Sequence, residues 1–226
     1  MTPHRLGLLL PSSGTVQEVD FYRRVPRHVT VHSARMRLPA ATEADEVRML
    51  DAHTLPAAAD LATIRPDVVV FSCTSAGALR GRAYETRLCQ EIAAAANAPV
   101  VSTMEAVRGE LALLGVQSVA VVTPYSATLT GPVRASLEAD GLAVPVAAGL
   151  GLTDSLEIAA VSPDEILRFA VETFQRGPAD AVFVACCTFR AFDARDAIAD
   201  TLGVPVVTSN QAALASALRM LGDGTA

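Results

Sequence analysis

Two cysteines stand at matching places in this sequence, each at the end of an apolar run. Cys73 ends the stretch PDVVVFSC and Cys186 ends the stretch ADAVFVAC, each six residues after an aspartate. Such short apolar runs predict buried strands of a parallel sheet, and open α/β sheets place their chemistry beyond the carboxyl ends of these strands. A lone cysteine at such a place is most often a small core residue. Two of them at equivalent positions favour a chemical role.

Paired thiols that face one cleft can carry out two kinds of reaction. One thiol can remove a proton from one face of a carbon acid while the other delivers a proton to the opposite face. Alternatively, one thiolate can attack a carbon atom while the second thiol supplies a proton. Each cysteine precedes a predicted helix, whose N-terminus lowers the pKa of a nearby thiol.

Hydroxyl residues gather at the same predicted strand ends. Thr74 and Ser75 follow Cys73, Cys187 and Thr188 follow Cys186, and Ser12, Ser13 and Ser126 end neighbouring strands. Hydroxyl and free backbone N–H groups at such turns bind a carboxylate and stabilise the enediolate that can form next to it. Tyr125 could donate a hydrogen bond to the same oxygens, or could pack half-buried on the sheet.

The order of these stretches repeats along the chain. LGLLLPSS, PDVVVFSC and APVVST in the first half correspond to VAVVTPYS, ADAVFVAC and VPVVTS in the second. This duplication predicts an α/β fold of two pseudo-symmetric lobes, each a small parallel β-sheet flanked by helices, with the active site in the cleft between them. We expect an N-terminal lobe over 1–114 and a C-terminal lobe over 115–210, with a last helix within 211–226 that packs back on the first lobe.

Some connecting segments carry weaker signals. We expect a strand at Val29–His32, followed by a loop with the sequence HSARMRLP. We also expect a strand at Ala143–Val146, followed by a loop over 149–155. Residues 41–61 space apolar side chains helically, with an interruption at Pro56. Glu46 falls among the acidic residues near the start of that helix, where a negative charge interacts favourably with the positive end of the helix dipole.

Composition narrows the function further. The chain has 226 residues, 51% of them hydrophobic and 4% aromatic, with a net charge of -6. Few aromatic residues and a negative charge argue against nucleic-acid binding. No apolar stretch resembles a membrane span or a signal peptide, so we expect a cytoplasmic protein with no membrane partner. Four cysteines without a disulfide framework fit a reducing compartment, and Cys89 reads as a core residue of a helix.

Metal and cofactor motifs are weak or absent in the sequence. Of the four histidines only His28 and His32 are four residues apart, and they fall across a strand pattern; no CxxC occurs. No glycine-rich dinucleotide or triphosphate loop follows a strand. We therefore expect no metal and no cofactor.

Five motifs together resemble one family. PSSGT at 11–15, HSARMRLP at 32–39, SCTSAGAL at 72–79, TPYS at 123–126 and CCTFRAFD at 186–193 resemble the maleate cis-trans isomerase and arylmalonate decarboxylase family of the aspartate/glutamate racemase superfamily. The resemblance covers essentially the whole chain. It implies a cofactor-independent homo-oligomeric enzyme in which Cys73 and Cys186 flank a small carboxylate substrate.

The resemblance also implies roles for individual residues. Cys73 would attack an alkene carbon, and Cys186 would supply and recover a proton. Matching Arg190 and Asp193 to the family pattern selects Cys186, rather than its neighbour Cys187, as the second catalytic cysteine. Cys187 would then lend its backbone N–H to the carboxylate site. Thr74, Ser75 and Tyr125 look like the dioxyanion hole of the decarboxylases, which carry glycine in place of Cys73.

Two positions depart from the isomerase pattern. Gly14 and Ser155 stand where the isomerases carry asparagine, so a substrate with one carboxylate and a bulkier or apolar second group would suit the site. The complete predicted substrate-binding set is Ser12, Gly14, Thr74, Ser75, Tyr125, Ser126, Ser155 and Cys187. We expect an isomerase or racemase that uses two thiols, with an arylmalonate-type decarboxylase as the alternative and a non-enzymatic carboxylate-binding protein as a third possibility.

Overall fold

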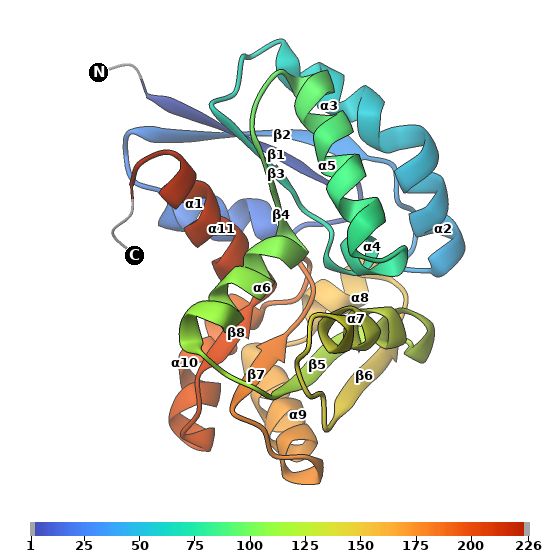
Figure 1. Cartoon of the computed structure of the whole chain (residues 1–226), viewed down its shortest axis with the longest axis vertical. Coiled ribbons are helices and arrows are strands. Elements are labelled where there is room, and N and C mark those ends of the chain that lie inside the picture. The colour runs from blue at the N-terminus through green and yellow to red at the C-terminus, as the bar shows by residue number, and fades with distance from the viewer. Residues whose placement is uncertain (1–2, 224–226) are drawn as a thin grey trace.

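The chain folds into two lobes, each built on a four-stranded parallel sheet (Figure 1). A computed structural model describes residues 3–223, so the last three positions of the predicted C-terminal helix segment lie outside the described residues. The first sheet has the order β2-β1-β3-β4 and the second has the order β6-β5-β7-β8. The first contains β1 (His4–Pro11), β2 (Val29–Met36), β3 (Val68–Phe71) and β4 (Val100–Ser102); the second contains β5 (Val119–Tyr125), β6 (Ala147–Leu152), β7 (Ala181–Val184) and β8 (Val206–Thr208).

The identical strand orders confirm the predicted duplicated α/β architecture. Each strand of the first sheet has a counterpart in the second, and the register repeats as well: Phe71 pairs with Ser102, and Val184 pairs with Thr208. The residues after β3 and β7 are therefore structurally equivalent, and so are those after β4 and β8. This places Cys73 and Cys186 at equivalent strand ends.

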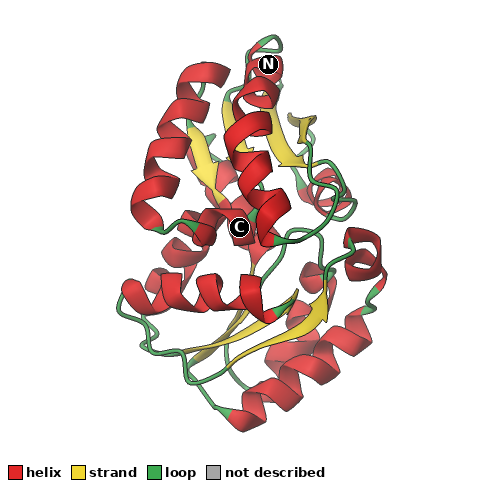
Figure 2. Ribbon diagram, turned by 90° about the vertical axis from the view of Figure 1, so that its right-hand side faces the viewer, coloured by secondary structure: helices red, strands yellow, loops and turns green. Residues whose placement is uncertain are grey.

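Helices cover both faces of the sheets (Figure 2). The first lobe carries α1 (Gln17–Arg24), α2 (Glu43–Arg48), a π-helical turn η1 (Met49–His53), α3 (Thr54–Ala62), α4 (Thr74–Leu79), α5 (Arg82–Ala96) and α6 (Thr103–Leu114). The second carries α7 (Ala127–Ala139), α8 (Ser155–Ala160), α9 (Pro163–Arg176), α10 (Ala191–Leu202) and α11 (Ser209–Met220). Helix α11 packs on α6, β3 and β4 as well as on α10 and β8, so it contacts both sheets.

Three local predictions were wrong. Strand β2 continues to Met36, through most of the segment expected to be a loop, because all of its residues pair with β1. The sixth strand is Ala147–Leu152, whereas Ala143 forms only an isolated bridge with Ser118. The long helix of residues 41–61 is divided by the π-helical turn upstream of Pro56, which lies in the first turn of α3, where a proline costs no hydrogen bond.

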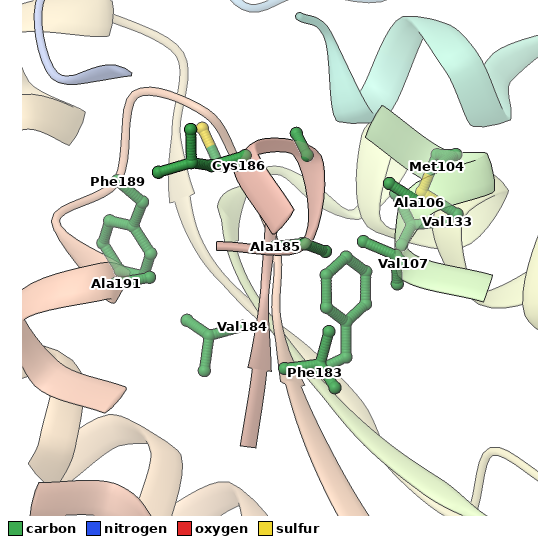
Figure 3. Packing of buried hydrophobic residues seen from close by; sticks show 14 of the residues in the cluster. Met104, Ala106, Val107, Val133, Phe183, Val184, Ala185, Cys186, Phe189 and Ala191 are labelled. Carbon is green, nitrogen blue, oxygen red and sulfur yellow. The ribbon is translucent and has the colours of Figure 1, made fainter. Parts of the chain in front are cut away.

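The core runs through both lobes. Apolar side chains of one face of the first sheet, the second sheet, α6 and α11 form one contiguous buried cluster, and the other face of the first sheet packs in a second cluster with α3 and α5. Figure 3 shows Phe183 on the side of Met104 and Val107 of α6, and Cys186 beyond Val184 and Ala185 at the end of β7. Cys186 thus lies two residues beyond the end of a fully buried strand.

Candidate active site

The carboxyl ends of the two sheets meet at a small pocket. Seven predicted residues line it: Cys73, Thr74, Ser75, Tyr125, Ser155, Cys186 and Cys187. They share it with Pro11, Leu38, Ala41, Glu46, Ser72, Ile158 and Thr188. The free space is about 20 Å³, enough for about one water molecule. A substrate of several carbon atoms therefore enters only when lining residues move apart.

Cys73 is a buried thiol at the start of α4. It lies at the N-cap position of that helix and is 5% exposed. Its Sγ atom is 3.9 Å from the hydroxyl oxygen of Ser75. Burial raises the pKa of the Cys73 thiol well above its usual value, and the neighbouring Glu46 and Cys187 raise it further. The thiol therefore needs a proton acceptor before it can act as a nucleophile.

Cys186 occupies a strained backbone position. Its φ angle is 101°, in a region that non-glycine residues rarely adopt and that costs about 1–3 kcal/mol. Its N–H donates to the hydroxyl oxygen of Ser209 at 3.0 Å, which holds this conformation in place. The N–H of Thr188 donates to the Cys186 sulfur at 3.3 Å. Strain at a buried thiol that is supported by these contacts is typical of a functional residue.

The surroundings of the Cys186 thiol suit a proton donor. Burial raises its pKa to about 12, so the thiol keeps its proton at neutral pH. Hydrogen bonds from the Tyr125 hydroxyl and from the N–H groups of Thr188 and Phe189 act in the opposite direction. These donors are in place to stabilise the thiolate that forms once the proton has been given away.

A reciprocal set of contacts joins the two halves of the repeat. Thr74 and Cys187 are equivalent positions, and their Oγ1 and Sγ atoms are 3.4 Å apart. Thr74 donates to Ser209, which follows β8, at 2.8 Å. In the other half of the repeat, the Cys187 sulfur lies 3.9 Å from the hydroxyl of Thr103, which follows the equivalent strand β4. The pseudo-twofold axis therefore passes between Thr74 and Cys187. The Cys187 sulfur faces these two threonines, which distinguishes it from the Cys186 sulfur.

Tyr125 is more deeply buried than a tyrosine that packs half-exposed on a sheet. It is 3% exposed, and burial raises its pKa well above the usual value, with the three nearby cysteines adding to the shift. The neighbouring strand β6 comes so close that a Cβ atom on Gly149 would lie 2.1 Å from the Tyr125 carbonyl oxygen. Glycine is therefore required at this close approach of β6 to Tyr125.

The remaining predicted residues differ in their placement. Ser155 lines the pocket and shares a hydrogen bond of 2.8 Å with Ser13. Ser12 accepts the N–H of Leu38 at 3.0 Å, and Ser126 shares a hydrogen bond of 2.8 Å with Thr128. Gly14 lies behind the pocket wall, where an added Cβ would be 3.3 Å from the Thr188 hydroxyl. Ser12, Gly14 and Ser126 do not line the pocket, and the substrate contacts of all eight predicted residues stay predictions.

Sequence reasoning missed Glu46. This carboxyl group is 1% exposed, lines the pocket and accepts a hydrogen bond from the Ser75 hydroxyl. Burial raises its pKa to about 7 despite that hydrogen bond, and Glu43 adds to the shift. Its position in the first turn of α2, beside other acidic residues, gave no local sign of burial.

Other features bear on the predicted classes of protein. Within residues 3–223, no three His, Cys, Asp or Glu side chains are grouped closely enough to hold a metal ion. Across the same part of the chain, every helix is too short or too polar to span a bilayer. Cys89 is half-buried, and it lines a separate groove of about 400 Å³ with Arg82 and Glu105.

Comparison with known proteins identifies the family. The family model for arylmalonate decarboxylase matches residues 33–226. The chain belongs to this family. It is 29% identical to a maleate isomerase from Geobacillus stearothermophilus, over 96% of this chain and 91% of that protein. It is also 30% identical to an arylmalonate decarboxylase from Bordetella bronchiseptica, over 70% of this chain and 66% of that protein.

A solved structure of a relative carries an informative intermediate. A mutant of the Nocardia farcinica maleate cis-trans isomerase with a covalently bound succinylcysteine intermediate superposes with a TM-score of 0.89. The two chains are 25% identical, and the match covers 97% of this chain and 93% of that one. The predicted family and fold are confirmed, and so is the prediction of an isomerase-type enzyme with a decarboxylase as the alternative.

Proposed function

We propose that this protein is a cofactor-independent isomerase of a small unsaturated carboxylic acid and works by covalent addition of Cys73 to the alkene. The two thiols at equivalent strand ends, which line one pocket with hydroxyl groups, are the observation that supports this most directly. The succinylcysteine adduct of the related isomerase is consistent with a cysteine nucleophile.

The proposed reaction proceeds through a saturated adduct. The Cys73 thiolate adds to one alkene carbon, and the electron pair of the double bond moves to the neighbouring carbon beside the substrate carboxylate. The hydroxyls of Thr74, Ser75 and Tyr125 would stabilise the enediolate charge. Cys186 then gives its proton to that carbon. The former double bond is now single and can rotate.

Elimination reverses these steps on the rotated adduct. The Cys186 thiolate takes back a proton, the double bond re-forms, and the bond from carbon to the Cys73 sulfur breaks. The different surroundings of the two thiols support these separate roles. Donors face the Cys186 sulfur, where a thiolate must be stabilised after proton transfer.

Proton NMR in D₂O tests the proposal. The protein is incubated with maleate and substituted cis-alkenoic acids, with aryl and alkyl malonates, and with chiral α-substituted acids. We expect geometric isomerisation, which is abolished in Cys73→Ala and lowered by at least ~10²-fold in Cys186→Ala, since proton transfer contributes about this much. Cys89→Ala, a cysteine outside the pocket, serves as the matched control and should retain full turnover.

A decarboxylase remains the second candidate function. The three hydroxyls of Thr74, Ser75 and Tyr125 at one pocket favour it, because loss of CO₂ needs a stabilised enediolate and a single proton donor. Full turnover by Cys73→Ala, with CO₂ loss from malonates, would establish this alternative. If the protein binds the acids but converts none of them, the third possibility, a non-enzymatic carboxylate-binding protein, would be favoured. A homo-oligomer in the cytoplasm stays a prediction.

A further inference from the structure

Glu46 is a buried carboxyl group that the reaction described above does not use. It extends from α2 into the pocket beside Cys73 and Ser75, and it is 1% exposed. Its Oε1 atom accepts the Ser75 hydroxyl, while its Oε2 atom has no hydrogen-bond partner among residues 3–223. A buried carboxyl with an unpartnered oxygen is costly for the fold. A group this costly at the pocket, beside Cys73, points to a role in the chemistry there.

Ser75 connects this carboxyl group to the nucleophile. Its hydroxyl donates to Glu46, and the hydroxyl oxygen lies 3.9 Å from the Cys73 sulfur. A hydroxyl can accept one proton while it donates another. We propose that Glu46 accepts the proton of the Cys73 thiol through Ser75 and so generates the nucleophilic thiolate. This rests on the proposed function, in which Cys73 attacks carbon.

Apart from the backbone N–H of Ala76 at the start of α4, which favours the thiolate, the pocket offers no cation and no second base among the described residues to activate the thiol. Nucleophilic cysteines commonly rely on a neighbouring cation or a base. In the described part of the chain, no Arg, Lys or His side chain lines the pocket, and Glu46 is its only carboxyl group. The Cys73–Ser75 separation is long for a hydrogen bond, as such contacts often are before a substrate binds.

Burial is the main cause of the high proton affinity of Glu46, and the charge of Glu43 adds to it. Its own helix carries Glu43, and the neighbouring α4 presents Cys73. The packed turn η1 carries Asp51 and His53, and Asp51 is held by Arg80 at 2.6 Å. Because burial raises the pKa of Glu46 to about 7, this carboxyl is partly ionised at neutral pH and accepts a proton more readily than an ordinary glutamate does.

The transfer is balanced without another reactant. The thiol proton moves from the Cys73 sulfur to the Ser75 oxygen as the Ser75 hydroxyl proton moves to Glu46. One negative charge thereby shifts from the carboxylate to the thiolate. The thiolate then forms the bond to carbon, and Cys186 supplies the proton to the neighbouring carbon. When elimination releases the Cys73 thiolate, the protons return along the same path.

Alkylation of Cys73 tests this step without a substrate. Iodoacetamide is applied at pH 7, and modification of Cys73 is followed by peptide mass spectrometry in the wild type, Glu46→Gln and Ser75→Ala. If Glu46 acted only through its charge, Glu46→Gln would speed alkylation, because a nearby negative charge opposes thiolate formation. The proton-transfer path predicts the opposite, a decrease of at least ~10-fold in both variants. Glu43→Gln removes an exposed carboxyl of the same helix and should leave the rate within about twofold.

The pH profile of turnover is the second readout. Wild-type kcat/KM should fall as the pH drops below about 7, because protonation of Glu46 removes the proton acceptor. Glu46→Gln should lose this acidic limb and fall ~10²-fold or more at neutral pH. An alkylation rate that is unchanged or faster in Glu46→Gln overturns the proposal. If Cys73 is too enclosed to react in either protein, an acidic limb that persists in Glu46→Gln overturns it instead.

The two proposals fail in different ways. Full turnover in Cys73→Ala contradicts the two-thiol isomerase, whatever the alkylation rates show. Slower alkylation in Glu46→Gln and Ser75→Ala supports the transfer path even if none of the tested acids is converted. Unfolding curves of each variant confirm that a lower rate does not reflect loss of the fold.

Discussion

Removal of the Arg108 side chain tests how the two lobes are held together. Arg108 of α6 is 7% exposed and donates to Glu85 at 2.7 Å, to Asp140 at 2.5 Å and to Ser136 at 2.7 Å. Glu85 belongs to the first lobe, whereas Ser136 and Asp140 lie at α7 of the second. This guanidinium group therefore links the lobes next to α4, the helix that follows Cys73 and packs on α7.

The expected cost follows from what Arg108→Met leaves behind. Glu85 is 3% exposed and would lose the cation that faces it, while Asp140 keeps a contact with Arg82 at 3.0 Å. Removing one partner of a buried ion pair costs about 3–5 kcal/mol. For a chain of this size each kcal/mol lowers the Tm by about 2–4 °C. We therefore expect Arg108→Met to unfold roughly 6–20 °C below the wild type.

The loss should also depend on pH. Burial raises the pKa of Glu85 above its usual value, and Arg108 counteracts this. Without Arg108 the folded-state pKa rises further above the unfolded-state value, so the folded state binds the extra proton more tightly. The stability of the variant is then greatest below the unfolded pKa and declines as the pH rises through the folded pKa. The difference from the wild type should be larger at pH 8 than at pH 5.

Thermal and urea unfolding at both pH values measure this effect. Arg134→Met is the matched control, because Arg134 forms an exposed pair with Glu138 that is worth at most about 1 kcal/mol. Adding Glu85→Gln to Arg108→Met should recover part of the loss by removing the unpaired charge. The reasoning is refuted if Arg108→Met shifts the Tm no more than Arg134→Met does.

Two further substitutions probe the surroundings of the thiols. Gly149→Ala would place a Cβ atom 2.1 Å from the Tyr125 carbonyl oxygen, so we expect a loss of about 1–3 kcal/mol or more in urea unfolding. Gly131→Ala, with nothing within 4 Å of its added Cβ, should be neutral or stabilising. Thr74→Val removes the hydroxyl that donates to Ser209 and should cost about 0.5–1.5 kcal/mol and lower kcat/KM in the NMR assay. Thr201→Val is the matched control for Thr74→Val. It loses only an exposed hydrogen bond to a carbonyl group of its own helix and should leave turnover unchanged.

The duplicated sheets were predictable because their signal is redundant. Both halves carry the same three apolar strands in the same order, and the buried strands read as continuous apolar runs. Strand β6 lacks this signal. Its sequence, AAGLGL, is partly exposed and includes glycines, of which Gly149 is required by the close approach to Tyr125. A strand whose composition is set by a neighbouring backbone cannot be recognised from its own residues.

The candidate site was predictable only where its residues lie at the ends of the repeated strands. Cys73 and Cys186 follow the duplicated strands, and the hydroxyl residues beside them were found for the same reason. Glu46 comes from α2, in a connecting segment outside the repeated stretches. Its local sequence is typical of a helix N-terminus, and it is buried by tertiary packing, which includes the contact of α2 with α4. The function of that carboxyl group is therefore a property of the tertiary structure.

The unequal surroundings of the two thiols favour an isomerase over a racemase. A racemase that works in both directions needs each thiol to serve in turn as acid and as base, which similar surroundings would satisfy. Here the symmetry is kept at Thr74 and Cys187 but only in part at the thiols themselves. Each thiol accepts one equivalent backbone N–H, that of Ala76 for Cys73 and that of Phe189 for Cys186. Beyond this, Cys73 faces the Ser75 hydroxyl and a carboxyl group, whereas Cys186 faces the Tyr125 hydroxyl and the N–H of Thr188. One thiol is thus supplied with a proton acceptor and the other with donors for its anion, the division of labour that addition to an alkene requires.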